Sequence, residues 1–272
     1  MAIKACSLTG WQVAGFRSGI AAGVLLVFLP EARRGWTWRT WAAGAAYAAT
    51  LVSFALANKL TTAANAIYLQ STAPLYMLVL GPLVLREKVR RADLVVFAAV
   101  GAGAAMVLFS SGSRAAVSGV PAGGSAQGNL LAVLSGFAWA CTLTSLRWLG
   151  RKRAEAETTA NPAAAAVIAG NLIAFAACLP AALPVARVGA ADAAALLYLG
   201  IFQVGLAYVF LTRSIRHVPA FEAATLLLAE PVFNPVWAWA LAREAPGIGA
   251  LAGGVLIVGA AFVSSVTGSR RP

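Results

Sequence analysis

Long apolar segments follow one another along the chain, separated by short polar or basic connectors. Each is close to the ~20 residues that cross a bilayer as a helix, and none alternates apolar and polar residues as a barrel strand would. The pattern predicts an all-α polytopic membrane protein with nine full spans. The expected spans cover residues 12–30, 40–58, 62–85, 93–110, 127–149, 161–184, 192–212, 218–242 and 247–267.

Composition agrees with a membrane protein. Of the 272 residues, 60% are hydrophobic and 11% are charged, whereas a soluble domain carries about a quarter charged residues. The net charge of +12 comes from basic residues between the apolar segments, which indicates membrane topology and argues against a nucleic-acid partner. The three cysteines and single histidine have no disulfide or zinc spacing.

The two halves of the chain resemble each other. When the sequence is shifted by 157 residues, Pro74 matches Pro231, Arg86 matches Arg243, and the glutamates that follow the arginines also match. Alanine and leucine matches are common in such a composition, but a proline and an Arg-Glu pair in one register are not. We therefore expect an internal repeat.

Basic residues in the connectors predict the orientation of the repeats. Alternate connectors hold fifteen Lys and Arg in one set and four in the other, so the richer set is expected to face the cytoplasm together with the C-terminus. The matched Arg-Glu pairs then fall on opposite sides of the membrane. The repeats are therefore expected to be inverted, with an odd number of helices each, as in many secondary transporters.

Five helices per repeat would give ten in all, one more than the nine expected spans. The first half is one helix short, which suggests that residues 1–7 are the tail of a largely missing first helix and that the start was assigned too late. A genuine nine-helix chain and a signal anchor at 15–30 are the alternatives. The expected organisation is a first repeat at 1–112, a linker at 113–126 rich in Gly, Ser and Ala, and a second repeat at 127–268.

Several segments resemble a known family. The sequence AEPVFNPVWAWALARE at 229–244 resembles the ninth helix of the EamA-like family of the drug/metabolite transporter superfamily, and APLYMLVLGPLVLRE at 73–87 resembles the fourth. AIKA at 2–5, Phe16-Arg17 and GFAWA at 136–140 resemble parts of the first, second and sixth helices. The resemblance implies ten helices in two inverted five-helix repeats. It also implies export or exchange of small metabolites, including amino acids, across the bacterial inner membrane.

An acid within an apolar span is the first candidate for chemistry. Glu230 lies within 218–242 beside Pro231, and a charge in the bilayer is costly unless it faces a cavity, pairs or binds a proton. Glu230 has two interpretations. It contacts a substrate amine or a proton, or it forms a buried hydrogen bond to a neighbouring helix. Glu222, nearer the cytoplasmic end, is expected to be solvated at a helix start. Arg17 is expected to be structural, either snorkelling outward or pairing with an acid.

Helical spacing places further polar and aromatic residues on shared faces of the spans. Such residues suit a small amphipathic solute, although helix packing through interhelical hydrogen bonds explains each one individually. The candidate pathway residues are Asn65, Tyr68, Thr72, Tyr47, Trp139, Thr142, Gln203, Tyr208 and Asn234, in addition to Glu230.

These observations favour a secondary transporter that works by alternating access on a small-molecule substrate. The alternative is a non-transporting or inactive truncated membrane protein. A pump with its own ATPase and a membrane hydrolase are disfavoured because the sequence has no Walker motif, nucleophile elbow or metal-ligand cluster. An intramembrane enzyme is disfavoured because paired acids and a His/Cys/Ser constellation are not found in the sequence. We expect no cofactor and no metal. The expected partners are the lipid bilayer and a small-molecule solute. A monomer and a homo-oligomer are both compatible with the sequence.

Overall fold

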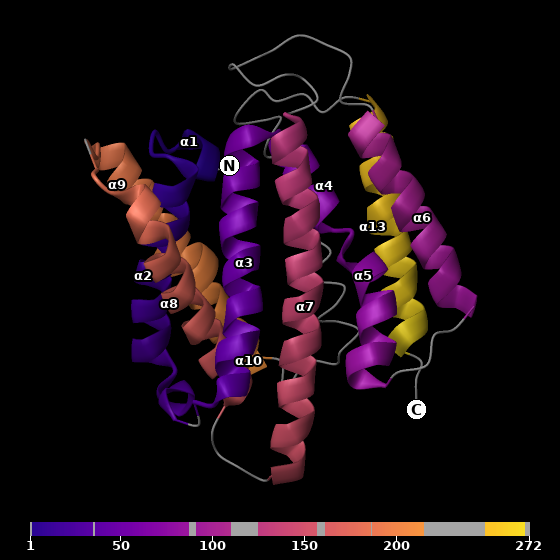
Figure 1. The fold of residues 1–272 in the computed structure, drawn as a ribbon, viewed down its shortest axis with the longest axis horizontal. Helices are drawn as coiled ribbons and strands as arrows, with labels where there is room; N and C mark the ends of the chain where they lie inside the picture. The colour runs from indigo at the N-terminus through magenta and orange to yellow at the C-terminus, as the bar shows by residue number, and fades with distance from the viewer. Residues whose placement is uncertain are drawn as a thin grey trace. The chain divides into compact units, whose positions relative to one another are not determined.

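A computed structural model describes residues 2–34, 36–86, 91–109, 125–156, 161–185, 187–214 and 248–269. Every regular element in these ranges is a helix (Figure 1). The elements are α1 (Ala2–Ala5), α2 (Gly10–Phe28), η1 (Pro30–Arg33), α3 (Trp38–Leu60), α4 (Ala63–Gln70), α5 (Ala73–Leu80), η2 (Gly81–Leu85), α6 (Arg91–Phe109), α7 (Ala126–Ala156), α8 (Pro162–Ala182), α9 (Ala190–Leu197), η4 (Tyr198–Leu206), α10 (Ala207–Ser214) and α13 (Ile248–Ser269).

Six helical segments in the described ranges are long and apolar enough to cross a membrane. They are Gly10–Phe28, Trp38–Leu60, Ala63–Leu85, Ala126–Gly150, Pro162–Ala182 and Ala190–Phe210. α6 and α13 carry shorter apolar stretches, Leu94–Phe109 and Ile248–Ala260. The expected span 218–242 lies outside the described residues. The all-helical membrane fold is thus confirmed, while the number of nine spans stays a prediction.

Large apolar side chains are exposed on several of these helices. Phe109 is 87% exposed, Leu83 74% and Val255 70%. In water such exposure would forfeit the hydrophobic free energy that burial provides. In a bilayer the surrounding acyl chains are as apolar as the side chains, so the exposure carries no comparable cost.

The contacts divide the chain into two compact units. The first unit contains residues 2–56 and 141–214, and the second contains 57–140 and 215–272 as far as they are described. Each unit therefore takes elements from both predicted halves of the sequence. The predicted repeat boundaries at 112 and 127 concern sequence similarity and stay a prediction.

In the first unit, α2 packs against α8 (Figure 1). Near the start of α2, Gln12 donates a side-chain hydrogen bond of 3.0 Å to the carbonyl of Ala182. Further along α2, a Cβ placed on Gly15 would lie 2.9 Å from the Cβ of Cys178, and one on Gly19 would meet the ring of Phe175. As residue numbers increase along α2, the numbers of the residues that it contacts on α8 decrease. The two helices therefore run antiparallel.

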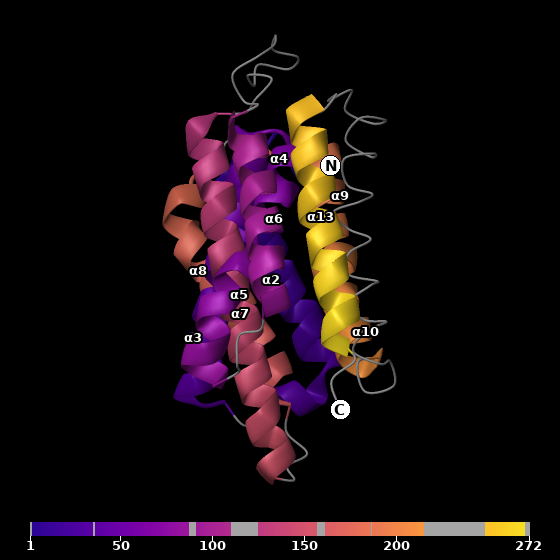
Figure 2. The ribbon, with the colours of Figure 1, turned by 90° about the vertical axis from the view of Figure 1, so that its right-hand side faces the viewer.

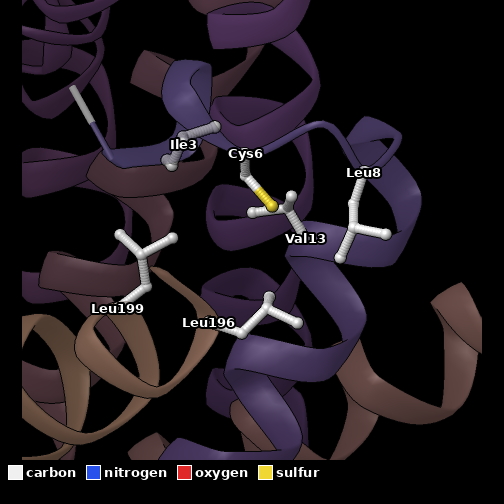
Figure 3. Packing of buried hydrophobic residues seen from close by; sticks show 6 residues of the cluster. All are labelled: Ile3, Cys6, Leu8, Val13, Leu196 and Leu199. Atoms are coloured by element: carbon white, nitrogen blue, oxygen red, sulfur yellow. The ribbon is translucent and has the colours of Figure 1, made fainter. Parts of the chain in front are cut away.

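The N-terminal segment of the first unit rests on α9 and η4. Ile3, Cys6 and Leu8 form a buried cluster with Val13 of α2 and with Leu196 and Leu199 (Figure 3). Beside this cluster, the carboxylate of Asp192 accepts hydrogen bonds of 2.6 Å from both the backbone N–H and the hydroxyl of Ser7. Apolar packing and a charge-assisted hydrogen bond therefore hold the same segment.

In the second unit, α6 and α13 lie side by side (Figure 2). A Cβ on Gly103 would lie 2.6 Å from the backbone oxygen of Gly253 and 2.8 Å from Cγ1 of Ile257. A Cβ on Gly253 would in turn meet the side chain of Val107. These contacts make the pair antiparallel. They also show that glycine allows the backbones to approach closely, as is usual between membrane helices.

Two expected spans are less regular than their sequence pattern predicts. The span 62–85 is interrupted at Ser71 and Thr72, between α4 and α5, and ends in the π-helix η2. Pro74 explains the interruption, because proline lacks an N–H and its ring clashes with the carbonyl four residues earlier. The span 192–212 is helical throughout, but its middle, η4, is a π-helix. π-helical turns are rare and occur frequently at functional sites.

Candidate functional site

A group of polar residues, all buried except the half-buried Tyr208, lies within the apolar helices of the first unit, and we call it the Arg17 cluster. It contains residues from five helices, α2, α3, α7, α8 and α10. Its members are Arg17, Tyr47, Thr50, Thr142, Asn171 and Tyr208. Three of them, Tyr47, Thr142 and Tyr208, are candidate pathway residues predicted from the sequence.

Tyr47 lies at the centre of the Arg17 cluster. It is 2% exposed, and its ring meets that of Tyr208 edge to face with centroids 5.4 Å apart. The Tyr47 side chain also interacts with the side chain of Asn171 and with the charge of Arg17. Close approach of α8 at this point depends on Gly170, since a Cβ there would lie 2.7 Å from Cδ1 of Tyr47.

Two threonines extend the Arg17 cluster from α3 to α7. The hydroxyl oxygens of Thr50 and Thr142 are 3.2 Å apart, and Thr50 also donates to the carbonyl of Ala46 at 3.0 Å. Thr50 lies one helical turn after Tyr47, so both side chains project from the same face of α3. The described cluster thus combines a cation, two phenols, two hydroxyls and an amide.

Arg17 carries the charge of the cluster. Its side chain is 2% exposed, and one Nη donates to the backbone oxygen of Leu51 at 2.9 Å. Its Nε is buried and has no hydrogen-bond acceptor among the described residues. The ionisable neighbours that interact with it are Tyr47, Tyr208 and Cys178, so no carboxylate in the described ranges neutralises it. Arg17 does not snorkel to a surface, contrary to one of the two structural expectations.

The second unit contains a separate group of hydrogen-bonded polar side chains. The side-chain oxygen of Asn129 accepts from the Thr61 hydroxyl at 2.6 Å and from the Asn65 amide at 3.3 Å. One and a half turns further along, the amide of Gln70 donates to the hydroxyl of Ser135 at 2.8 Å. These bonds join α7 to the helix that contains Asn65, as expected for polar interhelical contacts.

The other candidates of the second unit differ in their surroundings. Tyr68 is buried and packs against Gly254 of α13. Thr72 lies at the break between α4 and α5, and its hydroxyl donates to the carbonyl of Leu69 at 2.6 Å. Trp139 on α7 is half-buried. In the first unit, Gln203 is exposed on η4, where the π-helix changes which residues share a face.

Two predicted site residues, Glu230 and Asn234, lie outside the described residues, as does Glu222. The candidate pathway therefore stays a prediction, with its described members divided between the two units. Within the described ranges, no group of three or more His, Cys, Asp and Glu side chains is placed to hold a metal ion.

Sequence reasoning treated Arg17 as structural and left out Asn171. Asn171 is fully buried, its amide nitrogen donates to the carbonyl of Val167 at 2.9 Å, and its Oδ1 has no donor in the described structure. The signal that would have found it is the one applied to Glu230, namely a polar residue in the middle of an apolar span.

The chain is similar in fold to a protein of known structure. A solved structure titled "Crystal structure of protein" matches with a TM-score of 0.61 and 19% identity, covering 98% of this chain and 90% of that one. This likeness supports the fold alone. No curated protein sequence matches significantly.

The sequence model of the EamA-like transporter family matches residues 1–109 and 126–266, which is nearly the whole chain. The match agrees with the motifs at 73–87 and 229–244 and with the apolar helices of the fold. The chain is an integral membrane protein and belongs to the EamA-like transporter family.

Proposed function

We propose that this chain is a secondary transporter that exports or exchanges small metabolites, amino acids among them, by alternating access. The observation that carries the proposal is the Arg17 cluster: this member of a transporter family buries a cation, a phenol and an amide inside apolar helices, with a second, half-buried phenol beside them. Polar and ionisable groups are costly within a membrane and generally mark a substrate or ion pathway.

The proposed alternating access requires two inverted repeats, and the contacts between helices support such repeats. The shift of 157 residues places Arg91, the first residue of α6, on Ile248, the first residue of α13. It also places Gly10, the first residue of α2, within α8. Both pairs pack antiparallel within their units. Antiparallel contact between equivalent helices is expected of inverted repeats and not of parallel ones.

The interrupted helix of the second unit gives further support. α4 ends at Gln70 and α5 begins at Ala73, within one apolar segment that spans Ala63–Leu85. Broken helices at membrane depth are tolerated where they are buried in protein or line a cavity, and transporters use them to bind solutes. We therefore propose that the segment around Thr72 lies on the transport pathway.

The proposed topology has the C-terminus in the cytoplasm of a bacterial cell and the protein in its inner membrane. A single cysteine at Ser118, in a background without Cys6, Cys141 and Cys178, should react with an impermeant thiol reagent in intact cells. A cysteine at Ala154 should react only after permeabilisation, because its connector is rich in Lys and Arg. The reverse pattern would overturn the proposed orientation.

The experiment that tests the function is a growth screen followed by transport in vesicles. Cells that overproduce the chain should tolerate toxic amino acids or metabolite analogues that arrest the parent strain. Everted vesicles from those cells should accumulate the same compounds. If no compound in a broad panel distinguishes the two strains and vesicles accumulate none of them, the alternative of a non-transporting membrane protein is supported instead.

A further inference from the structure

We infer that Arg17 binds the carboxylate of the transported solute. The inference rests on the proposed function and names the substrate class: amphipathic organic acids, including amino acids, with an apolar or aromatic body. Its starting point is a charge balance. In the described ranges, the Arg17 guanidinium is buried among Tyr47, Tyr208 and Cys178 without an acidic partner.

The hydrogen bonds of Arg17 are as incomplete as its charge balance. A guanidinium carries five N–H donors in a fixed fork, yet the bond from Nη to the Leu51 oxygen leaves the buried Nε without an acceptor in the described structure. The adjacent Ser18 hydroxyl is also fully buried and has no partner there. An arginine fork whose Nε still lacks an acceptor is the group that binds a carboxylate with good geometry.

An acceptor in the cluster fits the rest of the solute. The amide nitrogen of Asn171 donates to the Val167 carbonyl. The Oδ1 of the same amide is buried, has no donor among the described residues and is available to accept a hydrogen bond. Tyr47 interacts with both Asn171 and Arg17, so both lie near the same phenol. An N–H of the solute would satisfy Asn171, and the edge-to-face rings of Tyr47 and Tyr208 offer contact to an aromatic body.

A carboxylate fits better than a phosphate because of its charge. One guanidinium balances one negative charge, whereas a phosphate group carries roughly −1.5 to −2 at neutral pH. The surplus negative charge would have no second cation to meet in the described cluster, and unpaired charge is strongly disfavoured in an apolar interior. The ammonium of an amino acid would instead meet the unpartnered Oδ1 of Asn171 and the two phenol rings. Because Arg17 is 2% exposed, the solute reaches it only after the helices of this unit open, as alternating access requires.

The test compares solutes that differ only in the acid group, on purified protein in detergent and in everted vesicles. The pairs are L-phenylalanine with L-phenylalaninamide and L-leucine with L-leucinamide, and phenyl phosphate is the phosphate probe. We expect at least one amino acid to raise the Tm of the wild type by roughly 5 °C at about a hundredfold excess over its Kd. The corresponding amide should need at least a tenfold higher concentration to give the same rise in Tm. In vesicles, the same amino acid should be transported at least ten times faster than its amide.

The variants separate binding from folding. Arg17→Gln should abolish the Tm shift and the preference for the acid, and Arg17→Lys, which keeps the charge but not the fork, should retain part of both. Arg33→Gln is the matched control, because Arg33 is exposed and its bonds in the described structure go to the carbonyls of Leu26 and Val27; it should behave as wild type. If Arg17→Gln does not fold, Arg17→Lys and the acid–amide comparison on the wild type still decide the question.

Each outcome favours or contradicts a specific part of the account. Amino acids that bind through Arg17 but are not transported support the site and contradict the transport function. Solutes that are transported equally as acid and amide, or with a preference that Arg17→Gln leaves unchanged, support transport and overturn the role of Arg17. Stabilisation by phenyl phosphate alone replaces the carboxylate with a phosphate, and stabilisation by none of the probes overturns the site.

Discussion

Replacing Gly103 with leucine is expected to force α6 and α13 apart at their close contact and to lower the thermal stability of the protein markedly. A Cβ at this position would lie 2.6 Å from the backbone oxygen of Gly253, and a backbone atom cannot rotate away as a side chain can. Overpacking a well-packed core costs about 1–3 kcal/mol or more. We expect a Tm in detergent roughly 10 °C below that of the wild type, and Gly253→Leu should have a similar effect.

The same two helices supply matched controls. A Cβ at Gly101 or at Gly259 meets nothing within 4 Å, so Gly101→Leu and Gly259→Leu add the same volume without a clash. Their Tm, measured by fluorescence-detected size-exclusion chromatography after heating, should stay close to that of the wild type. Equal losses from all four substitutions would show that helix packing at Gly103 is not the cause.

Substituting Glu230 with glutamine is expected to reduce transport at least tenfold while leaving the protein level in the membrane nearly normal. The proposed repeat places Glu230 on Ala73, the residue with which α5 begins directly after the helix break. One repeat thus has an acid where the other has an alanine. This asymmetry suggests that Glu230 contacts a polar group of the solute or binds a proton. Glutamine keeps the shape and removes the charge.

Glu222→Gln is the control for this prediction, because its position near the cytoplasmic end should give it access to water. It should transport at a rate close to that of the wild type. The measurement is uptake into everted vesicles across about pH 5.5 to 8, a range in which an acid in apolar surroundings exchanges its proton. If Glu230→Gln transports like the wild type throughout, the acid is structural, and the pathway must be sought at Tyr68, Trp139 and Gln203.

The helices could be predicted from sequence because apolar length is sufficient evidence for a membrane span. Their interruptions could not be predicted from length. Pro74 marks the break before α5, and the clash of its ring with the carbonyl four residues earlier is a local effect that the sequence contains. The π-helical register of η4 has no such marker. There Gly200 and Gly205 allow close contact with Ile20 and Val24 of α2, which only the tertiary structure shows.

Part of the candidate site could likewise be predicted from the sequence, and part could not. Tyr47 and Thr50, one turn apart on α3, could be assigned to a shared face by counting residues. The role of Arg17 could not, because it depends on Leu51, Tyr47 and Tyr208, which are distant in sequence and close in the fold. Gln203 follows a face computed for an α-helix, whereas η4 turns with a different period. Periodicity therefore predicts faces, and only contacts show what they meet.

Counterflow in liposomes tests the central claim of alternating access most directly. The purified chain is reconstituted, the liposomes are loaded with an unlabelled amino acid that the growth screen identifies, and a trace of the labelled compound is added outside. A carrier that exposes its site alternately exchanges one molecule for the other, so we predict a transient accumulation of label above equilibrium, with Arg17→Gln much reduced. Label that enters without an overshoot, or no faster than into protein-free liposomes, would contradict the account.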